Sequence, residues 1–328
     1  TTPPLRGGDE GEGDVCGFTY ELISNHRHHR KGSLRQTADQ QIFNALTIDV
    51  EDYFMVSAFS DIVQFDDWHK YESRIEKNTR KILDLLDEHK VQATFFVLGW
   101  IAERHPELIR DIHSRGHEIA CHSYNHRLIY HLTRAQFRED VYTAKRILED
   151  ITGAAISGYR APSYSITKKT LWALDILIEE GFLYDSSIFP IHHDLYGFPG
   201  ANRFPHVIKR GNGTIIEFPP STYKLFGQNI PVAGGGYLRL FPLQITKSMI
   251  KKINTKEKQP VTVYFHPWEI DIDQPRLNGC LKSKLRHYMN LKSTFPKLKS
   301  FLKEFRFRPL GEFADSSLTF NPPVSLQM

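Results

Sequence analysis

The sequence contains two histidines, His122 and His126, whose spacing suits the binding of one divalent cation. Residues four positions apart share one face of a helical turn, and two-histidine metal sites use this geometry. Residues 116–122 begin with glycine and are typical of a short buried strand. Both histidines would then follow the carboxyl end of a strand, where α/β folds place their chemistry. Alone, the pair is explained equally well as two surface histidines, because the chain has 16 histidines.

Other side chains that could act in catalysis also follow predicted strands. The apolar runs that predict buried strands cover residues 43–49, 91–99, 155–160, 181–185 and 260–266. Four of these runs end in a polar residue: Asp49, Arg160, Asp185 and His266. Chance is a poor explanation for polar groups at so many strand ends, so these residues are candidates for one site.

Helical segments lie between the predicted strands. Apolar residues recur with helical spacing over 75–89, 137–148 and 171–178. Alternation of strands and helices predicts a parallel sheet or barrel, in which the carboxyl ends of the strands meet at one edge. The polar groups at the strand ends are therefore expected to converge, although they are far apart in the sequence.

The order of these motifs resembles that of NodB-type polysaccharide deacetylases, carbohydrate esterase family 4. The matching motifs are Thr47 to Asp49, His122 to His126, Arg160 to Pro162, Asp185 to Ser187 and Val263 to His266. They span residues 42 to 275. Residues 47–54, 218–222, 229–237 and 265–269 also resemble the deacetylases encoded with exosortase-linked exopolysaccharide loci. The resemblance implies a distorted (β/α) barrel, a divalent metal, expected to be zinc, and hydrolysis of N-acetyl groups on amino sugars.

Two carboxylates, Glu51 and Asp52, are candidates for the third protein ligand of the metal. The family pattern has two adjacent aspartates, a base and a ligand, whereas here Asp49 is followed by Val50, Glu51 and Asp52. Alternation along a strand places Glu51 on the same side as Asp49 and favours it. Asp52 could reach the metal only if the strand has already ended.

Hydrolysis of an amide needs an activated water, a stabilised oxyanion and a proton for the departing amine. A cation held by two histidines and a carboxylate can activate the water and polarise the carbonyl. We expect Asp49 to be the general base and His266 to protonate the leaving nitrogen. Arg160 is expected to orient Asp49 through a bidentate pair. Asp185 has two equal interpretations: it orients His266, or it caps a turn.

Aromatic residues near these motifs suit a sugar, because flat apolar rings pack against the hydrophobic faces of pyranoses. Most aromatic side chains in a protein belong to the core, so only a few are expected to contact ligand. The four selected as substrate-binding candidates are Tyr53, Tyr164, Tyr237 and Trp268.

Length and composition predict one large core with extensions, because the chain has 328 residues and is 40% hydrophobic. Residues 1–40 are poor in apolar side chains and are expected to be disordered. The catalytic domain is expected to cover 41–275. Residues 276–328 are expected to form a basic extension packed on the barrel, with a surface for an anionic glycan or a membrane. Nucleic acid is not expected, because no binding module accompanies this charge.

Three cysteines without metal spacing favour a reducing compartment. The sequence has no apolar run of about 18 residues and no visible signal peptide, so a cytoplasmic or membrane-peripheral location is expected. Two other functions stay open. One is an amidohydrolase acting on a cyclic ureide, and the other is a glycan-binding protein without activity. The intact set of Asp49, His122, His126 and His266 argues against the inactive protein.

Overall fold

The structure is a computed structural model that describes residues 42–194, 196–232, 234–315 and 321–325. Residues 1–40, for which the sequence predicts disorder, lie outside the described part of the chain. Across the described part of the chain, no helix is long and apolar enough to span a membrane.

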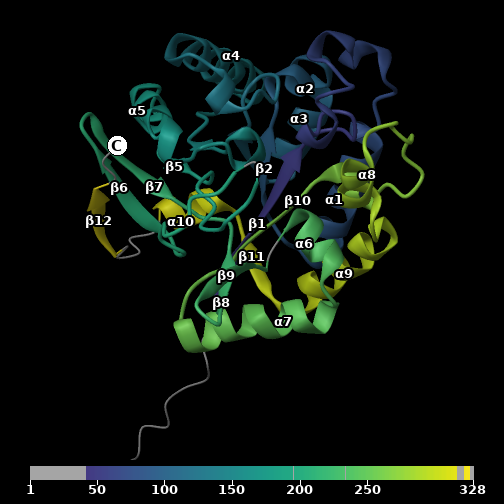
Figure 1. Ribbon diagram of the computed structural model, residues 1–328. Coiled ribbons are helices and arrows are strands. Elements are labelled where there is room, and N and C mark those ends of the chain that lie inside the picture. Colours follow the sequence, from purple (N-terminus) through teal and green to yellow (C-terminus); the bar gives the residue numbers. More distant parts are fainter. Residues whose placement is uncertain (1–41, 195, 233, 316–320, 326–328) are drawn as a thin grey trace, which may run out of the picture. The chain divides into compact units, whose positions relative to one another are not determined.

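A mostly parallel sheet of ten strands lies at the centre of the fold (Figure 1). Its strands are β1 (Phe43–Val50), β2 (Thr94–Val97), β3 (Glu118–Cys121), β4 (Gly158–Tyr159), β5 (Tyr184–Asp185), β6 (His206–Arg210), β7 (Gly213–Glu217), β10 (Thr262–Phe265), β11 (Arg306–Arg308) and β12 (Asn321–Ser325). The spatial order is β10-β1-β2-β3-β4-β5-β7-β6-β12, and β11 pairs with β1. Only β6 and β7 pair antiparallel among these strands. The predicted α/β fold is confirmed.

The first strand, β1, lies next to the edge strand β10, and its side chains are almost all buried. β1 is flanked by β10 and β2, and all its residues except Phe43 are buried. A strand that is covered on both faces has a continuous run of apolar residues rather than an alternating pattern. Such a run predicted β1 from the sequence.

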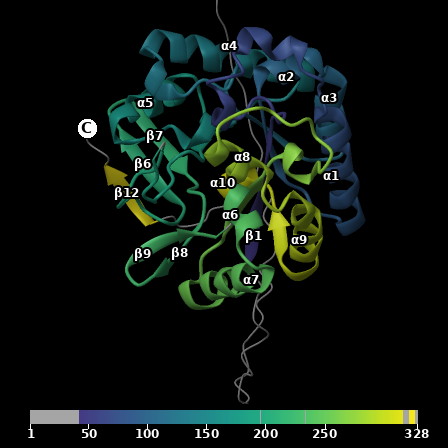
Figure 2. The same cartoon turned by 45° about the vertical axis from the view of Figure 1, so that its right-hand side comes forward.

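The first five helices follow the strands as expected. They are α1 (Ile75–His89), α2 (Gly99–Arg104), α3 (Pro106–Ser114), α4 (Arg134–Thr152) and α5 (Trp172–Glu179). In Figures 1 and 2 they lie around the outside of strands β1 to β5. Helix α4 begins with a capping box between Thr133 and Gln136 and ends at Gly153, whose φ of 68° is left-handed. The helices predicted over 75–89, 137–148 and 171–178 are thereby confirmed.

The second half of the chain contains elements that the sequence did not predict. They are the hairpin β8 (Thr222–Leu225) and β9 (Gln228–Pro231), and helices α6 (Gly235–Leu240), α7 (Leu243–Lys252), α8 (Leu281–Tyr288), α9 (Leu291–Glu304) and α10 (Leu310–Asp315). Short helical turns include η1 (Ser57–Phe59), η4 (Pro162–Tyr164) and η7 (Pro267–Ile270). Helix α9 contacts α1, α6 and η7, so the later elements pack on the turn that follows β10.

Candidate metal centre and active site

Three buried side chains, Glu51, His122 and His126, form a group whose ligand atoms all lie within 4.8 Å of one another. Glu51 follows the end of β1, and His122 follows the end of β3. The helical turn expected for the histidine pair is wrong. Residues 122–126 form a loop in which Ser123 (φ 67°) and His126 (φ 57°) adopt left-handed conformations. The loop still brings the two imidazole centroids to 5.4 Å.

The ring of His122 is prepared to bind a cation. Its Nδ1 lies 2.7 Å from the carbonyl oxygen of Arg160. A carbonyl only accepts hydrogen bonds, so Nδ1 carries the proton and Nε2 keeps its lone pair. Burial lowers the pKa of His122 to about 4, which keeps the ring neutral at ordinary pH. A neutral imidazole held by a carbonyl on its other nitrogen is a common form of a metal ligand.

The carboxylate of Glu51 completes the group. Its Oε1 accepts a hydrogen bond from Nε1 of Trp268 at 3.3 Å. Its buried Oε2 lies 2.9 Å from Nε2 of His126 but has no hydrogen-bond donor among the described residues. Burial raises the pKa of Glu51, yet the neighbouring charges of His126 and His266 outweigh burial and hold it at about 2. An ionised, buried oxygen that faces two imidazoles fits a divalent cation.

Asp52, the other candidate ligand, lies outside this group. Its carboxylate accepts hydrogen bonds from the Ser73 hydroxyl and from the backbone N–H groups of Tyr53, Arg74 and Ile75. These groups include the start of α1, where a helix has N–H groups without partners. The strand does end at Val50, but the helix rather than the metal group takes the Asp52 side chain.

Asp49 is held by the fully buried guanidinium of Arg160. Nη1 of Arg160 donates to Oδ1 of Asp49 at 2.6 Å and to Oγ1 of Thr47 at 2.8 Å. Its Nη2 donates to Oγ of Ser186 at 2.8 Å. The bidentate pair expected from the sequence is therefore wrong, because Arg160 divides its donors among three side chains. Oδ2 of Asp49 faces Nε2 of His266 at 3.7 Å.

His266 is oriented by Glu269, a residue that the sequence reasoning missed. Nδ1 of His266 lies 2.6 Å from Oε1 of Glu269, which is fully buried. Nε2 lies 3.3 Å from Oε1 of Glu51. Burial lowers the pKa of His266, but the three carboxylates of Glu51, Glu269 and Asp49 outweigh it and raise the value to about 9. The signal available in the sequence was the spacing of three residues between His266 and Glu269.

Asp185 is fully buried at the end of β5 and does not take that orienting position. Its Oδ1 accepts a hydrogen bond from the Ser187 hydroxyl. It pairs in register with Glu217 of β7. Burial raises the pKa of Asp185 to about 6, and burial together with the Asp185 charge raises the pKa of Glu217 well above its usual range. The two carboxyl groups therefore form a buried pair that keeps its protons to higher pH than exposed carboxyl groups do.

A cavity of about 600 Å³ opens over these groups. Asp49, Glu51, His122, His126 and His266 all line it. Among the four predicted substrate-binding rings, those that line the cavity are Tyr164, Tyr237 and Trp268. Tyr53 does not line it, because its side chain is 1% exposed and packs edge-on against Phe54. Lining residues that were not predicted include Ser57, Ser163, Tyr196, Tyr264 and Arg286.

Two protein families match successive parts of the chain. Residues 61–177 match the polysaccharide deacetylase family, and residues 186–315 match a domain of unknown function, DUF3473. The peptidoglycan-N-acetylglucosamine deacetylase of Bacillus cereus is 36% identical over 98 residues, which are 30% of this chain and 36% of that protein. The chitooligosaccharide deacetylase of Bradyrhizobium sp. is 34% identical over 99 residues, which are 30% and 43%. The chain thus spans less than half the length of these two relatives.

Solved structures support the same fold. A protein of Mycobacterium smegmatis assigned to the polysaccharide deacetylases has a TM-score of 0.56 at 22% identity, over 85% of this chain and 92% of that one. The allantoinase PuuE has a TM-score of 0.51 at 18% identity, over 82% and 88%. Identities this low show the fold alone. The family matches therefore indicate a polysaccharide deacetylase domain over residues 61–177, followed by a DUF3473 domain over residues 186–315.

Proposed function

We propose that this protein is a metal-dependent hydrolase that removes N-acetyl groups from the amino sugars of a poly- or oligosaccharide. The observation that carries the proposal is the position of Asp49 and His266 beside the buried group of Glu51, His122 and His126 on one cavity. The names of the relatives, which act on peptidoglycan and on chitooligosaccharides, support this substrate class.

The side chains divide the work of amide hydrolysis. His122, His126 and Glu51 would hold a divalent cation, which supplies Lewis acidity to the carbonyl and lowers the pKa of water. Oδ2 of Asp49 accepts a proton from water while the water oxygen bonds to the acetyl carbon. The carbon–nitrogen bond then breaks, and Nε2 of His266 gives a proton to the departing nitrogen. Acetate and a free amino sugar are the products.

His266 is suited to the acid role by its surroundings. The carboxylate of Glu269 accepts from Nδ1, which leaves Nε2 as the nitrogen that points toward Asp49 and Glu51. The raised pKa of His266 keeps the imidazolium populated at neutral pH, so a proton is available for the leaving amine. Arg160 neutralises one oxygen of Asp49 and leaves the other for the reaction.

We further propose that the cation is zinc and that the glycan is an exopolysaccharide. Two imidazoles and one carboxylate are a ligand set used by catalytic zinc sites. We propose an exopolysaccharide because the sequence resembles the deacetylases encoded with exosortase-linked loci. Contact of the basic residues after Arg276 with an anionic glycan or a membrane surface stays a prediction.

The test combines metal analysis with acetate release. Purified protein should contain one divalent metal per chain and release acetate from N-acetylated chitooligosaccharides. Chelation should abolish the release, and adding zinc back should restore it. Allantoin serves as the comparison substrate. Hydrolysis of allantoin without acetate release would support the cyclic ureide alternative, and glycan binding without any hydrolysis would support an inactive binding protein.

A further inference from the structure

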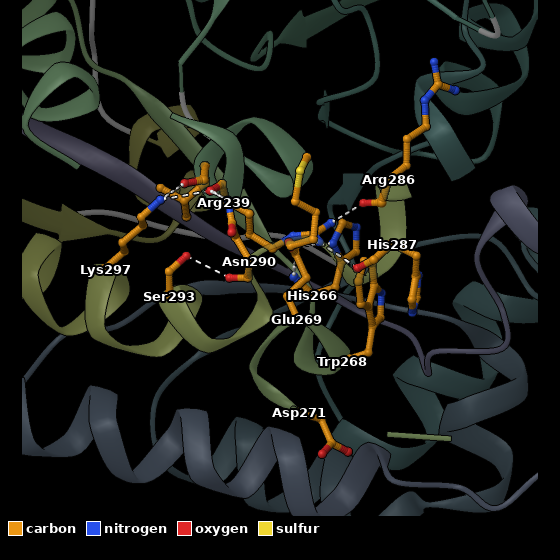
Figure 3. Close-up of polar contacts among 12 residues, drawn as sticks. Arg239, His266, Trp268, Glu269, Asp271, Arg286, His287, Asn290, Ser293 and Lys297 are labelled. Atoms are coloured by element: carbon orange, nitrogen blue, oxygen red, sulfur yellow. Dashed lines mark hydrogen bonds and ion pairs between the residues drawn. The ribbon is translucent and has the colours of Figure 1, made fainter. Parts of the chain in front are cut away.

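Arg239 of α6 is a buried cation at the back of the active site. Its side chain is 3% exposed and lies beside Glu269, His266 and His287 (Figure 3). Nε of Arg239 donates to Oε2 of Glu269 at 2.6 Å. The guanidinium also lies over the ring of Trp268, 5.1 Å from the ring centre.

Glu269 links this cation to the proposed acid. One oxygen, Oε1, accepts from Nδ1 of His266 at 2.6 Å and from its backbone N–H at 3.1 Å. The other oxygen accepts from Arg239. A fully buried carboxylate needs compensation of its charge, and here a cation lies on one side and an imidazole on the other. Without Arg239, one oxygen of Glu269 would lose its cation, and the carboxylate would be free to turn away from His266.

The remaining donors of Arg239 hold the end of α8. Nη1 donates to the carbonyl oxygens of His287 at 2.6 Å and Met289 at 3.0 Å, and Nη2 donates to that of Arg286 at 3.0 Å. The last carbonyls of a helix have no partners within the helix, and a cation is favourable there. The side chains of Arg286 and Met289 line the cavity, so this contact fixes part of its wall.

The same segment supports the metal group. The ring of His287 is stacked on Trp268, with centroids 4.0 Å apart and an angle of 13° between the planes. The indole N–H of Trp268 in turn donates to Glu51. Arg239 therefore contacts, through one or two neighbours, both His266 and Glu51.

We propose that Arg239 is a positioning residue for deacetylation. Through Glu269 it holds the imidazole of His266 with Nε2 toward the reacting amide. Through its hydrogen bonds to the carbonyls at the end of α8 it also fixes the neighbouring part of the cavity wall. The proposal rests on the proposed function, and it gives the DUF3473 region a specific task, because Arg239, His266 and Glu269 all lie within residues 186–315.

Lys297 of α9 provides a matched control. Its Nζ donates to the carbonyl oxygens of Leu238 at 2.8 Å, Arg239 at 3.1 Å and Phe241 at 2.8 Å (Figure 3). It thus holds the end of α6, and its hydrogen bonds go to that backbone rather than to Glu269. Lys297→Met removes a cation from the same neighbourhood and leaves the link between Arg239 and Glu269 in place.

The kinetic experiment compares two substrates in the full chain loaded with zinc. Arg239→Met should lower kcat/KM for an N-acetylated chitooligosaccharide on the order of 10–100-fold, as loss of an orienting partner does. The loss should be much smaller for an acetylated phenol, whose leaving group needs little protonation. Lys297→Met should lower the melting temperature but keep the ratio between the two substrates. Equal losses on both substrates in Arg239→Met would overturn the proposal.

Crystal structures of the wild type and both variants give a readout that does not depend on activity. In Arg239→Met the contact between Nδ1 of His266 and Glu269 should be lost, whereas Lys297→Met should keep it. A retained contact in Arg239→Met would overturn the positioning role even if activity falls. If the wild type releases no acetate, the proposed function fails, and the crystal structures still decide whether Arg239 orients His266. If Arg239→Met does not fold, Glu269→Gln replaces it, with the same expected change of substrate ratio.

Discussion

The two sides of the active site are built in different ways. On one side, Glu51 and His122 directly follow strands of the sheet, and the hydrogen bond from His122 goes to the backbone of Arg160, just after the neighbouring strand β4. On the other side, His266 also follows a strand, β10, but its ring is held by a chain of buried side chains, Glu269 and Arg239, that reaches into α6 and α8. The ring of His122 is thus oriented by backbone at the end of the sheet, whereas the ring of the proposed acid is oriented by charges that must compensate one another.

This difference predicts how a substitution on each side affects metal binding and activity. Loss of a metal ligand should remove the cation and leave the sheet intact, because the backbone that carries the ligands is held by its strands. Loss of a side chain on the acid side should leave the cation bound and impair protonation of the leaving group. Three sets of variants separate the two outcomes, and a fourth variant, at a buried carboxyl pair outside the cavity lining, should leave activity almost unchanged.

The largest effect is expected for the double variant His122→Ala/His126→Ala. Without two imidazoles the site should lose its divalent metal, and kcat/KM should fall by about 10³-fold or more, since metal catalysis supplies several kcal/mol. Metal analysis and acetate release measure the change, and circular dichroism checks the fold. His113→Ala, which alters an exposed histidine of α3, should keep full metal content. Full metal occupancy in the double variant would show that His122 and His126 are not the metal ligands.

His266→Ala should come next. It removes the proton donor and keeps Glu51, His122 and His126, so metal content should stay at the wild-type level. Activity on the amide should fall on the order of 10²–10⁴-fold, the usual contribution of a general acid. Activity on an acetylated phenol should survive better. Equal losses on ester and amide would indicate that His266 is structural or stabilises the oxyanion.

Substitutions of the neighbouring residues Glu51 and Asp52 should have different effects. Glu51→Gln should lower metal occupancy under competition with a chelator, because a neutral amide is a weaker ligand than a carboxylate. Asp52→Ala should keep the metal and lower the free energy of unfolding by about 1–2 kcal/mol, because the N–H groups at the start of α1 lose their acceptor. Chemical denaturation and metal analysis of both variants test the contrast, which would be reversed if Asp52 were the ligand.

The smallest effect on activity is expected at the buried carboxyl pair of Asp185 and Glu217. Both pKa values are raised in the folded state, so the folded protein holds protons that the unfolded chain releases above pH 4. The contribution of the pair to stability is present below pH 4 and is lost as the pH rises through 6. Glu217→Gln keeps the acceptor for the N–H of Ile188 and removes the charge. It should raise the stability at pH 8, on the order of 1–3 kcal/mol, and have less effect at pH 4.

Unfolding free energies measured across this pH range test that expectation. A wild-type protein whose stability is flat between pH 4 and 8, or a Glu217→Gln variant with the wild-type pH dependence, would show that the pair does not retain protons. Acetate release at a fixed pH should change little, because Glu217 is outside the cavity lining.

The sequence by itself determined the elements whose signals are local. Continuous apolar runs predicted β1, β2, β4, β5 and β10, and helical spacing predicted α1, α4 and α5. Because the carboxyl ends of parallel strands meet at one edge, the convergence of Asp49, His122 and His266 was also predictable. The spacing of His122 and His126 indicated a common ligand position, although their conformation is a loop rather than a helical turn.

Only the tertiary structure decided between side chains that are equivalent in sequence. Glu51 and Asp52 both follow β1, and the start of α1 takes Asp52 because its N–H groups need an acceptor. Tyr53 and Tyr237 are both aromatic, yet one packs in the core and the other lines the cavity. Arg239 and Glu269 lie 30 residues apart with no periodic pattern between them. Their pairing follows from the burial of a carboxylate that needs a cation, and such long-range compensation of charge leaves no local trace in the sequence.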